Sequence, residues 1–511
     1  MTAISDYFRT ALLIDDRVEP DYRALEDIGI SQADAPPSEP GPGLVEPPPE
    51  DETPVLPSSL VGAFLAEGVV CSVVEPTDDP AEIELTALRG AQIADLLILD
   101  WLLFGNASAT MGAIGEIAEQ NRSRLRVIVV FTGAHSLSDV AARLVEELDF
   151  QGDDFVLRRG NTVVLVFGKP GPPLTGGEAR RQPSSDYRDL PGMIRDDLEM
   201  MFRGLMPEFA FRGINTLREA APRILATFNS DLDGAVLVHR ALLPEPDDAG
   251  PQFVKLLASD FEQAMHDERI GEVWDQESVR AYVERTTLHS SPDRLAKRLR
   301  SNQAVSGEIK ALDDSELARE AIVDGLSRIG MTDREVSRAV GDLAESVGST
   351  KASNESLASL MSSTSLGETP PRLELGVVLQ DEEGCYWLCM QPLCDSVRLD
   401  SSRAFPMLPL VLDPREPAAM IRSPAGDAVR VGFESSPHRL VMLEFRPGPE
   451  RAVIADGDPS NWRFTSDDGA EYRAITRLRP EVAAQAVHGL ASAASRTGAD
   501  ASEWLRRGAS S

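Results

Sequence analysis

The first third of the chain is predicted to form a doubly wound α/β domain around a five-stranded parallel sheet. Continuous apolar runs such as Leu96–Leu99 and Val127–Phe131 are typical of strands that are buried on both faces of a parallel sheet. Between these runs, apolar residues recur at the three- and four-residue spacing of amphipathic helices. Strand and helix patterns alternate in this way five times, which favours parallel strands joined by right-handed crossovers.

The rest of the 511-residue chain changes pattern twice. Apolar residues keep helical spacing through most of 189–347, which predicts a mainly α-helical domain. From 371 to 480, short runs separated by turn residues predict a small all-β domain, either a barrel or a sandwich. Closing helices are expected within 481–511. The Pro- and Gly-rich stretch Pro170–Ser185 indicates a linker, which is assigned to 176–188. The Ser- and Thr-rich segment 348–370 is interpreted as a second linker.

Composition narrows the classes of partner and compartment. The chain has 50 Lys and Arg against 83 Asp and Glu, a formal net charge of −33. This charge repels both phosphate backbones and anionic lipid surfaces, so we expect no nucleic-acid and no membrane partner. The stretch after Met1 lacks the character of a signal peptide, and no window approaches the ~20 apolar residues that span a bilayer. Four cysteines predict no disulfide framework. The expected location is the cytoplasm.

The predicted sheet begins with the apolar strand Ala11–Ile14, which runs into two adjacent carboxylates, Asp15 and Asp16. Neighbouring carboxylates repel each other, and a cation between them relieves the repulsion. The acidic, proline-rich stretch 31–57 contains no Lys or Arg and is interpreted as an inserted loop. The elements expected before the central strand are a helix, a strand and a second helix, at 58–67, 69–74 and 80–92.

The central predicted strand ends in a single carboxylate, Asp100. Taken alone, this residue is better explained as a helix cap. Two later strands change that interpretation, because strand 125–131 leads into Thr132 and strand 162–167 leads to Lys169. The carboxyl ends of parallel strands lie at one edge of a sheet, where open α/β sheets bind their ligands. We therefore expect the acids, the hydroxyl and the lysine to meet there.

Together these residue types can bind a metal and accept a phosphoryl group. Three carboxylates form an oxygen-rich site that suits Mg²⁺. Asp100 can attack phosphorus and form an acyl phosphate, whose developing charge a metal neutralises. Lys169 supplies a cation and Thr132 a hydroxyl donor to the phosphoryl oxygens. The Lys169-Pro170 step also predicts a cis peptide bond that turns the lysine inward.

Four motifs at successive strand ends resemble the receiver domain of two-component response regulators. They are I-D-D at Ile14–Asp16, L-D-W at Leu99–Trp101, F-T-G at Phe131–Gly133 and K-P at Lys169-Pro170. The resemblance covers about residues 8–175 and implies the flavodoxin-like, five-stranded fold of that family. It says nothing about the other two thirds of the chain.

The resemblance implies a role for each site residue. The implied ligands of Mg²⁺ are the side chains of Asp15, Asp16 and Asp100 and the backbone carbonyl of Leu102. In the family, a sensor histidine kinase donates a phosphoryl group to the acceptor, here Asp100. The implied partners of that group are Thr132 and Lys169. The chain is thus expected to be a phosphoprotein of a phosphorelay and not an enzyme.

Several features depart from the family pattern. The insertion at 31–57 lengthens the domain, and an extra strand is expected around Phe155–Arg158, in a hairpin with Thr162–Phe167. Val166 stands where the family has an aromatic switch residue, and Leu103-Phe104 replaces its usual Met-Pro. Phosphoacceptance is expected to be intact, whereas the familiar relay to a partner surface is in doubt.

Three functions are left open by the sequence. The first is an Mg²⁺-dependent phosphoaspartate receiver in histidine-kinase signalling. It would signal through the rest of the chain, or act without a conventional output domain as a phosphate sink beside a sister response regulator. Receiver-like proteins of bacterial anti-phage three-component systems are similar in this respect, which suggests antiviral defence. The second is a receiver-fold adaptor that is not phosphorylated. The third is an enzyme with an unrecognised site in 371–480.

Overall fold

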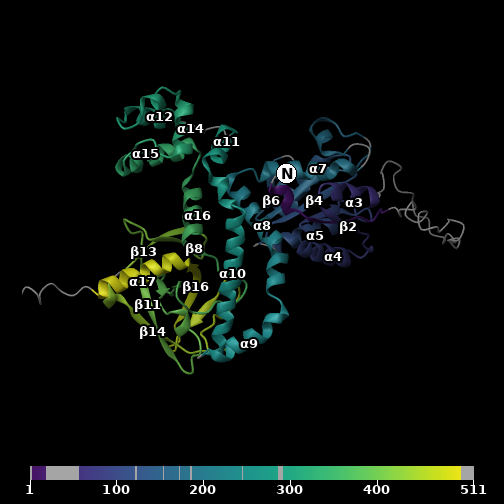
Figure 1. Cartoon of the computed structure of the whole chain (residues 1–511). Coiled ribbons are helices and arrows are strands. Elements are labelled where there is room, and N and C mark those ends of the chain that lie inside the picture. Colours follow the sequence, from purple (N-terminus) through teal and green to yellow (C-terminus); the bar gives the residue numbers. More distant parts are fainter. Residues whose placement is uncertain are drawn as a thin grey trace, which may run out of the picture. The chain divides into compact units, whose positions relative to one another are not determined.

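The computed structural model of the protein describes residues 3–18, 57–120, 124–153, 155–171, 173–183, 187–243, 245–285, 292–434 and 436–495 (Figure 1). All of the predicted insertion 31–57 except Pro57 lies outside these residues. The chain divides into two compact units, 1–286 and 287–511, and each is described by itself. The division falls within 189–347, which the sequence predicts to be one helical domain.

The first unit contains a sheet of seven strands, not the five that were predicted. Its order is β2-β1-β3-β4-β7-β6-β5. Five of the strands run parallel to one another: β1 (Thr10–Ile14), β2 (Val70–Val74), β3 (Leu96–Asp100), β4 (Arg126–Thr132) and β7 (Thr162–Gly168). Strands β3, β4 and β7 are buried along almost their whole length, as expected for strands covered on both faces.

The two additional strands form an antiparallel extension of the sheet. Strand β6 (Val156–Arg159) pairs with β7, which confirms the predicted hairpin, and β5 (Gln151–Asp153) pairs with β6. The sequence reasoning missed β5 because Gln-Gly-Asp has neither the length nor the apolar alternation of a recognisable strand.

Helices on one face of the sheet form the first hydrophobic core. They are α4 (Pro80–Ile93), α5 (Ala107–Gln120) and α6 (Leu137–Leu148), and Figure 1 shows α4 and α5 side by side. Helix α4 begins with Asp79 as its N-cap and a proline at its first position. Helix α6 begins where Ser136 accepts the backbone N–H of Asp139 at 3.2 Å. Their apolar faces pack on Ile14, Leu99 and Val130 of the strands.

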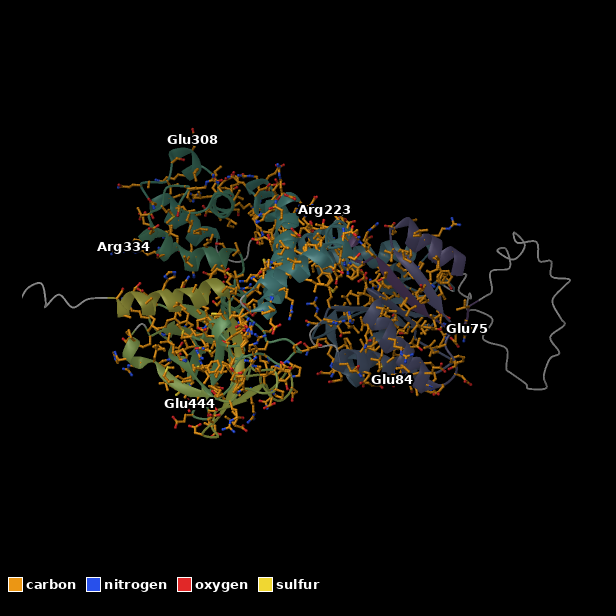
Figure 2. The ribbon with its side chains drawn as sticks, turned by 60° about the horizontal axis from the view of Figure 1, so that its bottom comes forward. Glu75, Glu84, Arg223, Glu308, Arg334 and Glu444 are labelled. Carbon is orange, nitrogen blue, oxygen red and sulfur yellow. The ribbon has the colours of Figure 1, made fainter. Side chains whose placement is uncertain are left out.

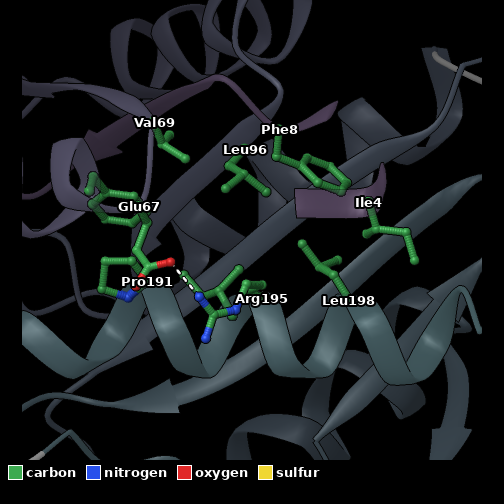
Figure 3. A pocket seen from close by; sticks show the side chains of 10 residues that line it. Ile4, Phe8, Glu67, Val69, Leu96, Pro191, Arg195 and Leu198 are labelled. Atoms are coloured by element: carbon green, nitrogen blue, oxygen red, sulfur yellow. Dashed lines mark hydrogen bonds and ion pairs between the residues drawn. The ribbon is translucent and has the colours of Figure 1, made fainter. Parts of the chain in front are cut away.

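The other face is covered by helices from both ends of the unit. They are α1 (Ala3–Tyr7), α3 (Pro57–Ala66), α7 (Leu190–Met201) and α8 (Leu205–Thr227). Leu190, Ile194 and Leu198 of α7 share one core with the strands. Figure 3 shows Pro191, Arg195 and Leu198 of α7 facing Leu96 and Phe8, and the Glu67–Arg195 ion pair borders an apolar cavity of about 30 Å³. The α/β core therefore extends beyond residue 175.

Arg218 attaches α8 to the amino-terminal edge of the sheet. Its guanidinium donates to Asp95 Oδ1 at 3.2 Å and to the carbonyl oxygen of Tyr7 at 2.5 Å, and it stacks 4.5 Å from the centre of the Tyr7 ring. Asp95 also accepts the backbone N–H groups of Arg9 and Thr10. The remaining long helices of this unit are α9 (Asp233–Leu242), α10 (Ala249–Asp267) and α11 (Gln276–Arg285).

The second unit begins with a small helical bundle. Its helices are α12 (Pro292–Ser301), α13 (Gly307–Lys310), α14 (Asp314–Asp324) and α15 (Asp333–Ser346). Helix α13 ends before the Asp313–Glu316 capping box that starts α14. Gly325, at φ +80°, then ends α14.

The predicted linker 348–370 contains helix α16 (Lys351–Ser362) and the short strand β8 (Ser363–Thr364). Thr350 and Ser353 form a reciprocal cap at the start of α16. Serine and threonine at this position therefore start a helix, where composition alone had favoured a linker.

The β-rich region is one nine-stranded antiparallel sheet. Its strands after β8 are β9 (Val377–Gln380), β10 (Tyr386–Cys389), β11 (Arg403–Leu412), β12 (Ala419–Arg422), β13 (Ala428–Phe433), β14 (Val441–Phe445), β15 (Arg463–Thr465) and β16 (Glu471–Leu478). Val377 and Leu379 enter one core and Val378 the other, so apolar residues are buried on both faces. Helix α17 (Pro480–Ala494) contributes Ala483 and Ala486 to the second core.

The surfaces of both units carry exposed carboxylates, such as those of Glu75, Glu308 and Glu444 in Figure 2. They belong to the excess of acids that gives the net charge of −33. Among the helices that the structure describes, none has the length and apolar content required to cross a bilayer.

Replacing Gly152 with alanine is expected to destabilise the hairpin of β5 and β6. The new Cβ would lie 2.2 Å from the carbonyl oxygen of Val156, a backbone atom that cannot move aside cheaply. The free energy of unfolding, measured in urea, should fall by about 1–3 kcal/mol. Gly62 in α3 is the control, since no atom lies within 4 Å of its added Cβ. Gly62→Ala should leave stability unchanged or raise it by up to about 1 kcal/mol; equal losses in both variants would contradict this geometry.

Candidate metal and phosphoryl site

The structure brings the five predicted side chains together at the carboxyl edge of the parallel strands. Asp15 follows β1, Asp100 ends β3, Thr132 ends β4 and Lys169 follows β7, and all four are buried. Asp16 is half-buried beside them. Strands β1, β3, β4 and β7 are consecutive in the sheet, so the order of the strands itself creates this neighbourhood.

The Lys169 ammonium forms ion pairs with two of the carboxylates. Its Nζ lies 2.7 Å from Asp15 Oδ2 and 2.9 Å from Asp100 Oδ2. The three side chains are between 0 and 4% exposed, so water screens these charges little. The burial of Lys169 opposes its charge, but attraction to Asp100 and Asp15 outweighs burial and raises its pKa.

The surroundings of Asp100 disfavour its charged form. Burial raises its pKa to about 6, and repulsion from Asp15 and Asp16 acts in the same direction, while attraction to Lys169 opposes both. Three carboxylates and one ammonium leave the cluster with a formal charge of −2. A bound divalent cation would balance it.

The carboxylate oxygens fit a hard cation. One oxygen from each of Asp15, Asp16 and Asp100 lies within 4.8 Å of the others. Asp16 Oδ2 accepts the backbone N–H of Phe104 at 2.7 Å, while its Oδ1 is buried and has no hydrogen-bond partner. Asp15 Oδ1 accepts the N–H of Arg17 at 2.9 Å. An orphaned buried oxygen in an all-oxygen donor set is what Mg²⁺ coordination would satisfy.

A tight turn follows Asp100. Phe104 and Gly105 both have positive φ, at 50° and 73°, and the Leu102 carbonyl oxygen accepts the N–H of Gly105 at 3.0 Å. Leu102 also donates its N–H to Asp100 Oδ1 at 3.3 Å. The structure thus places the Leu102 carbonyl on the turn beside the carboxylates, and its role as a metal ligand stays a prediction.

Sequence reasoning missed Thr110, which lies on α5. This side chain is fully buried, and its hydroxyl donates to the backbone carbonyl of Asp100 at 2.8 Å. The bond fixes the backbone at Asp100. Thr110 is a polar residue among the apolar residues of the helix that follows Asp100, and this was the signal in the sequence. A threonine in a helix more often faces solvent, so the spacing did not single it out.

The last backbone hydrogen bond between β4 and β7 positions Lys169. Its N–H donates to the carbonyl oxygen of Thr132 at 2.6 Å, and Thr132 Oγ1 accepts the N–H of Ala134 at 3.0 Å. The prediction of a cis bond before Pro170 is wrong, because the peptide is trans. Strand pairing and the two ion pairs already turn the lysine inward without it.

A protein-family model described as a response receiver domain matches residues 7–171. This segment is a response receiver domain. The match confirms the resemblance inferred from the four strand-end motifs, all of which lie inside it. It covers the amino-terminal third of the chain, so the family of the remainder is not defined by it. Searches of the curated proteins and of the solved structures gave no match.

The raised pKa of Asp100 makes the stability of the receiver domain depend on pH. Between pH 3.8, the ordinary pKa, and about pH 6, Asp100 keeps its proton in the folded state but has lost it in the unfolded state. The stability of the fold therefore falls as the pH rises through that window. Asp100→Asn removes the carboxylate and therefore the cost of ionising it in this buried, negatively charged site. Without divalent metal, the variant should be more stable than the wild type at pH 7, by on the order of 1–3 kcal/mol, and gain little at pH 4.

Urea denaturation in EDTA at the two pH values measures this difference. Asp78→Asn is the matched control, because Asp78 is an exposed carboxylate in the loop after β2. It should change stability little at either pH. An Asp100→Asn protein that is less stable than the wild type at pH 7 would contradict this electrostatic account of the cluster.

Proposed function

We propose that the protein is an Mg²⁺-dependent phosphoacceptor that takes a phosphoryl group on Asp100 in a histidine-kinase signalling system. The observation that carries the proposal is the buried Asp15–Lys169–Asp100 cluster at the strand ends of a receiver domain. A buried cation and an orphaned carboxylate oxygen around one nucleophilic carboxylate suit phosphoryl transfer.

In this proposal Asp100 is the nucleophile. One of its carboxylate oxygens forms a bond to phosphorus while the bond from phosphorus to the donor nitrogen breaks, and the electron pair leaves with that nitrogen, which takes up a proton. Lys169 moves from its carboxylate partners to a phosphoryl oxygen, and the Thr132 hydroxyl donates to another. Their burial keeps competing water away from these interactions.

Mg²⁺, when bound, supplies positive charge that neutralises the transferring phosphoryl group. The residues that would hold it are Asp15, Asp16 and Asp100 through their side chains and Leu102 through its backbone carbonyl. Asp16 is suited to this role by its free Oδ1, because its other oxygen is already held by Phe104.

A sensor histidine kinase is the proposed donor, and the chain itself is not proposed to be an enzyme. The proposed location is the cytoplasm, without nucleic-acid or membrane partners, in keeping with the net charge of −33. We further propose that the protein acts either through residues 189–511 or as a phosphate sink beside a sister response regulator. If the protein is a phosphate sink, we propose that it acts in antiviral defence.

Incubation with radiolabelled acetyl phosphate and Mg²⁺ should label the wild-type protein in an acid-stable, base-labile form. Asp100→Asn should abolish the label, because the nucleophile is lost. Asp78→Asn, with its exposed carboxylate, should label like the wild type. EDTA should prevent labelling. Label that persists in Asp100→Asn would contradict the proposed acceptor. A folded wild-type protein that takes no label would favour the adaptor function instead.

Trp101 offers a direct measurement of Mg²⁺ binding. The indole is buried, it follows Asp100 in the chain, and its ring centre lies 5.4 Å from Cζ of Arg143. Titration with Mg²⁺ should therefore change the intrinsic tryptophan fluorescence in a saturable way. The change should be lost in Trp101→Phe, which removes the reporter. It should be weakened in Asp16→Asn, which exchanges a charged ligand for a neutral one. A Mg²⁺-independent signal would contradict the proposed metal site.

A further inference from the structure

A short segment beyond the receiver match lies against the proposed phosphoryl site. It comprises residues 173–183, and we call it the strap; it includes the 3₁₀ helix η2 (Gly176–Arg181). Its residues Leu174 and Gln182 line a cavity of about 20 Å³ together with Thr132 and Lys169. The strap is therefore an immediate neighbour of both residues that would engage a phosphoryl group.

Gln182 ties the strap to the strand end that carries Lys169. Its Nε2 donates to the carbonyl oxygen of Lys169 at 2.9 Å, and its Oε1 accepts the N–H of Leu174 at 3.0 Å. Leu174 packs on the core, and a Cβ added at Gly168 would lie 2.9 Å from its Cδ1. The start and the end of the strap are thus both fixed beside Lys169.

Glu178 ties the middle of the strap to the start of α6, the helix that follows Thr132. Its Oε1 accepts the backbone N–H of Ser138 at 2.9 Å and the Ser138 hydroxyl at 2.6 Å. Ser138 lies in the first turn of α6, where the helix dipole favours a carboxylate. Only a short loop separates it from Thr132.

Arg181 ties the strap to α7. The guanidinium pairs with the buried Asp197 of α7 at 2.5 Å and donates from Nε to the Val166 carbonyl oxygen of β7 at 3.1 Å. It also stacks 4.0 Å from the centre of the Phe167 ring. The Arg181 side chain therefore connects strand β7 to helix α7.

We propose that phosphorylation of Asp100 releases the strap and loosens the hold of Arg181 on α7. The inference rests on the proposed phosphoacceptor function. A phosphoryl group on Asp100 draws Lys169 and Thr132 toward its oxygens. The movement displaces the Lys169 carbonyl from Gln182, and it shifts the loop that leads from Thr132 to Ser138, where Glu178 is attached. The added negative charge also disfavours the Glu178 carboxylate at the same edge of the sheet. The strap thereby links the site to helices outside the receiver match.

Hydrogen exchange on the full-length protein, read by mass spectrometry with and without acetyl phosphate and Mg²⁺, tests the proposal. Intact mass first shows whether one phosphoryl group has been added. In the phosphorylated wild type, peptides covering 173–183 and 190–201 should exchange at least roughly twofold more at short times, while the peptide of α4 should not change.

Two variants should mimic the release without phosphate. Glu178→Ala removes the attachment to Ser138 and Gln182→Leu the attachment to Lys169, so exchange in 173–183 should already be raised in both. Phosphorylation should then raise it by less than in the wild type, because one attachment is already lost. Glu147→Ala is the matched control, because Glu147 is an exposed carboxylate near the other end of α6 that pairs with Arg143. It should behave like the wild type.

The outcomes separate this proposal from the proposed function. A phosphoryl mass increase with unchanged exchange in 173–201 overturns the release of the strap and leaves phosphoacceptance standing. The absence of a mass increase overturns phosphoacceptance and the release together. The release is supported if exchange in 173–183 rises on phosphorylation in the wild type and is already raised without phosphate in the two strap variants.

Discussion

The buried Lys169 ammonium between Asp15 and Asp100 is the interaction on which the rest of the site depends. Three carboxylates at one strand edge would repel one another strongly in a region from which water is excluded, and one cation reduces that repulsion without removing it. Removing the Lys169 ammonium from this cluster should cost about 3–5 kcal/mol, because the buried carboxylates are left without compensation. Removing Asp100 is different, because Lys169 keeps its ion pair with Asp15. The remaining excess of negative charge is what a bound divalent cation would balance, and the raised pKa of Asp100 has the same cause.

The sequence predicted which side chains lie together, because their placement follows from strand order. Residues that end neighbouring parallel strands must meet, so Asp15, Asp100, Thr132 and Lys169 could be placed together once their strands were recognised. Elements without a periodic signal were missed. Strand β5 is too short and too polar to be recognised. The start of α16 was interpreted as a linker because it is rich in Ser and Thr, but these residues cap the helix. The tertiary partners of single polar residues, such as Thr110 and Gln182, leave no pattern in the sequence at all.

The match to the receiver family ends at residue 171, but the core of the α/β unit does not. Helix α7 places Leu190, Ile194 and Leu198 against the sheet, and Arg181 fastens it to β7. A fragment that ends at residue 171 would expose this face, so the receiver domain and the helices after it depend on one another for stability. This continuity gives chemistry at Asp100 a physical route to residues beyond the receiver match, through groups that already touch Lys169 and the start of α6.

The central claim is that Asp100 becomes an acyl phosphate. Reduction of the phosphorylated protein with borohydride converts such a group to homoserine, and peptide mass mapping then locates the modified residue. Homoserine is expected at position 100, in a Mg²⁺-dependent amount, with Asp15 and Asp16 unmodified. Reduction at another carboxylate, or an unmodified position 100 in a protein shown to carry the phosphoryl group, would contradict it.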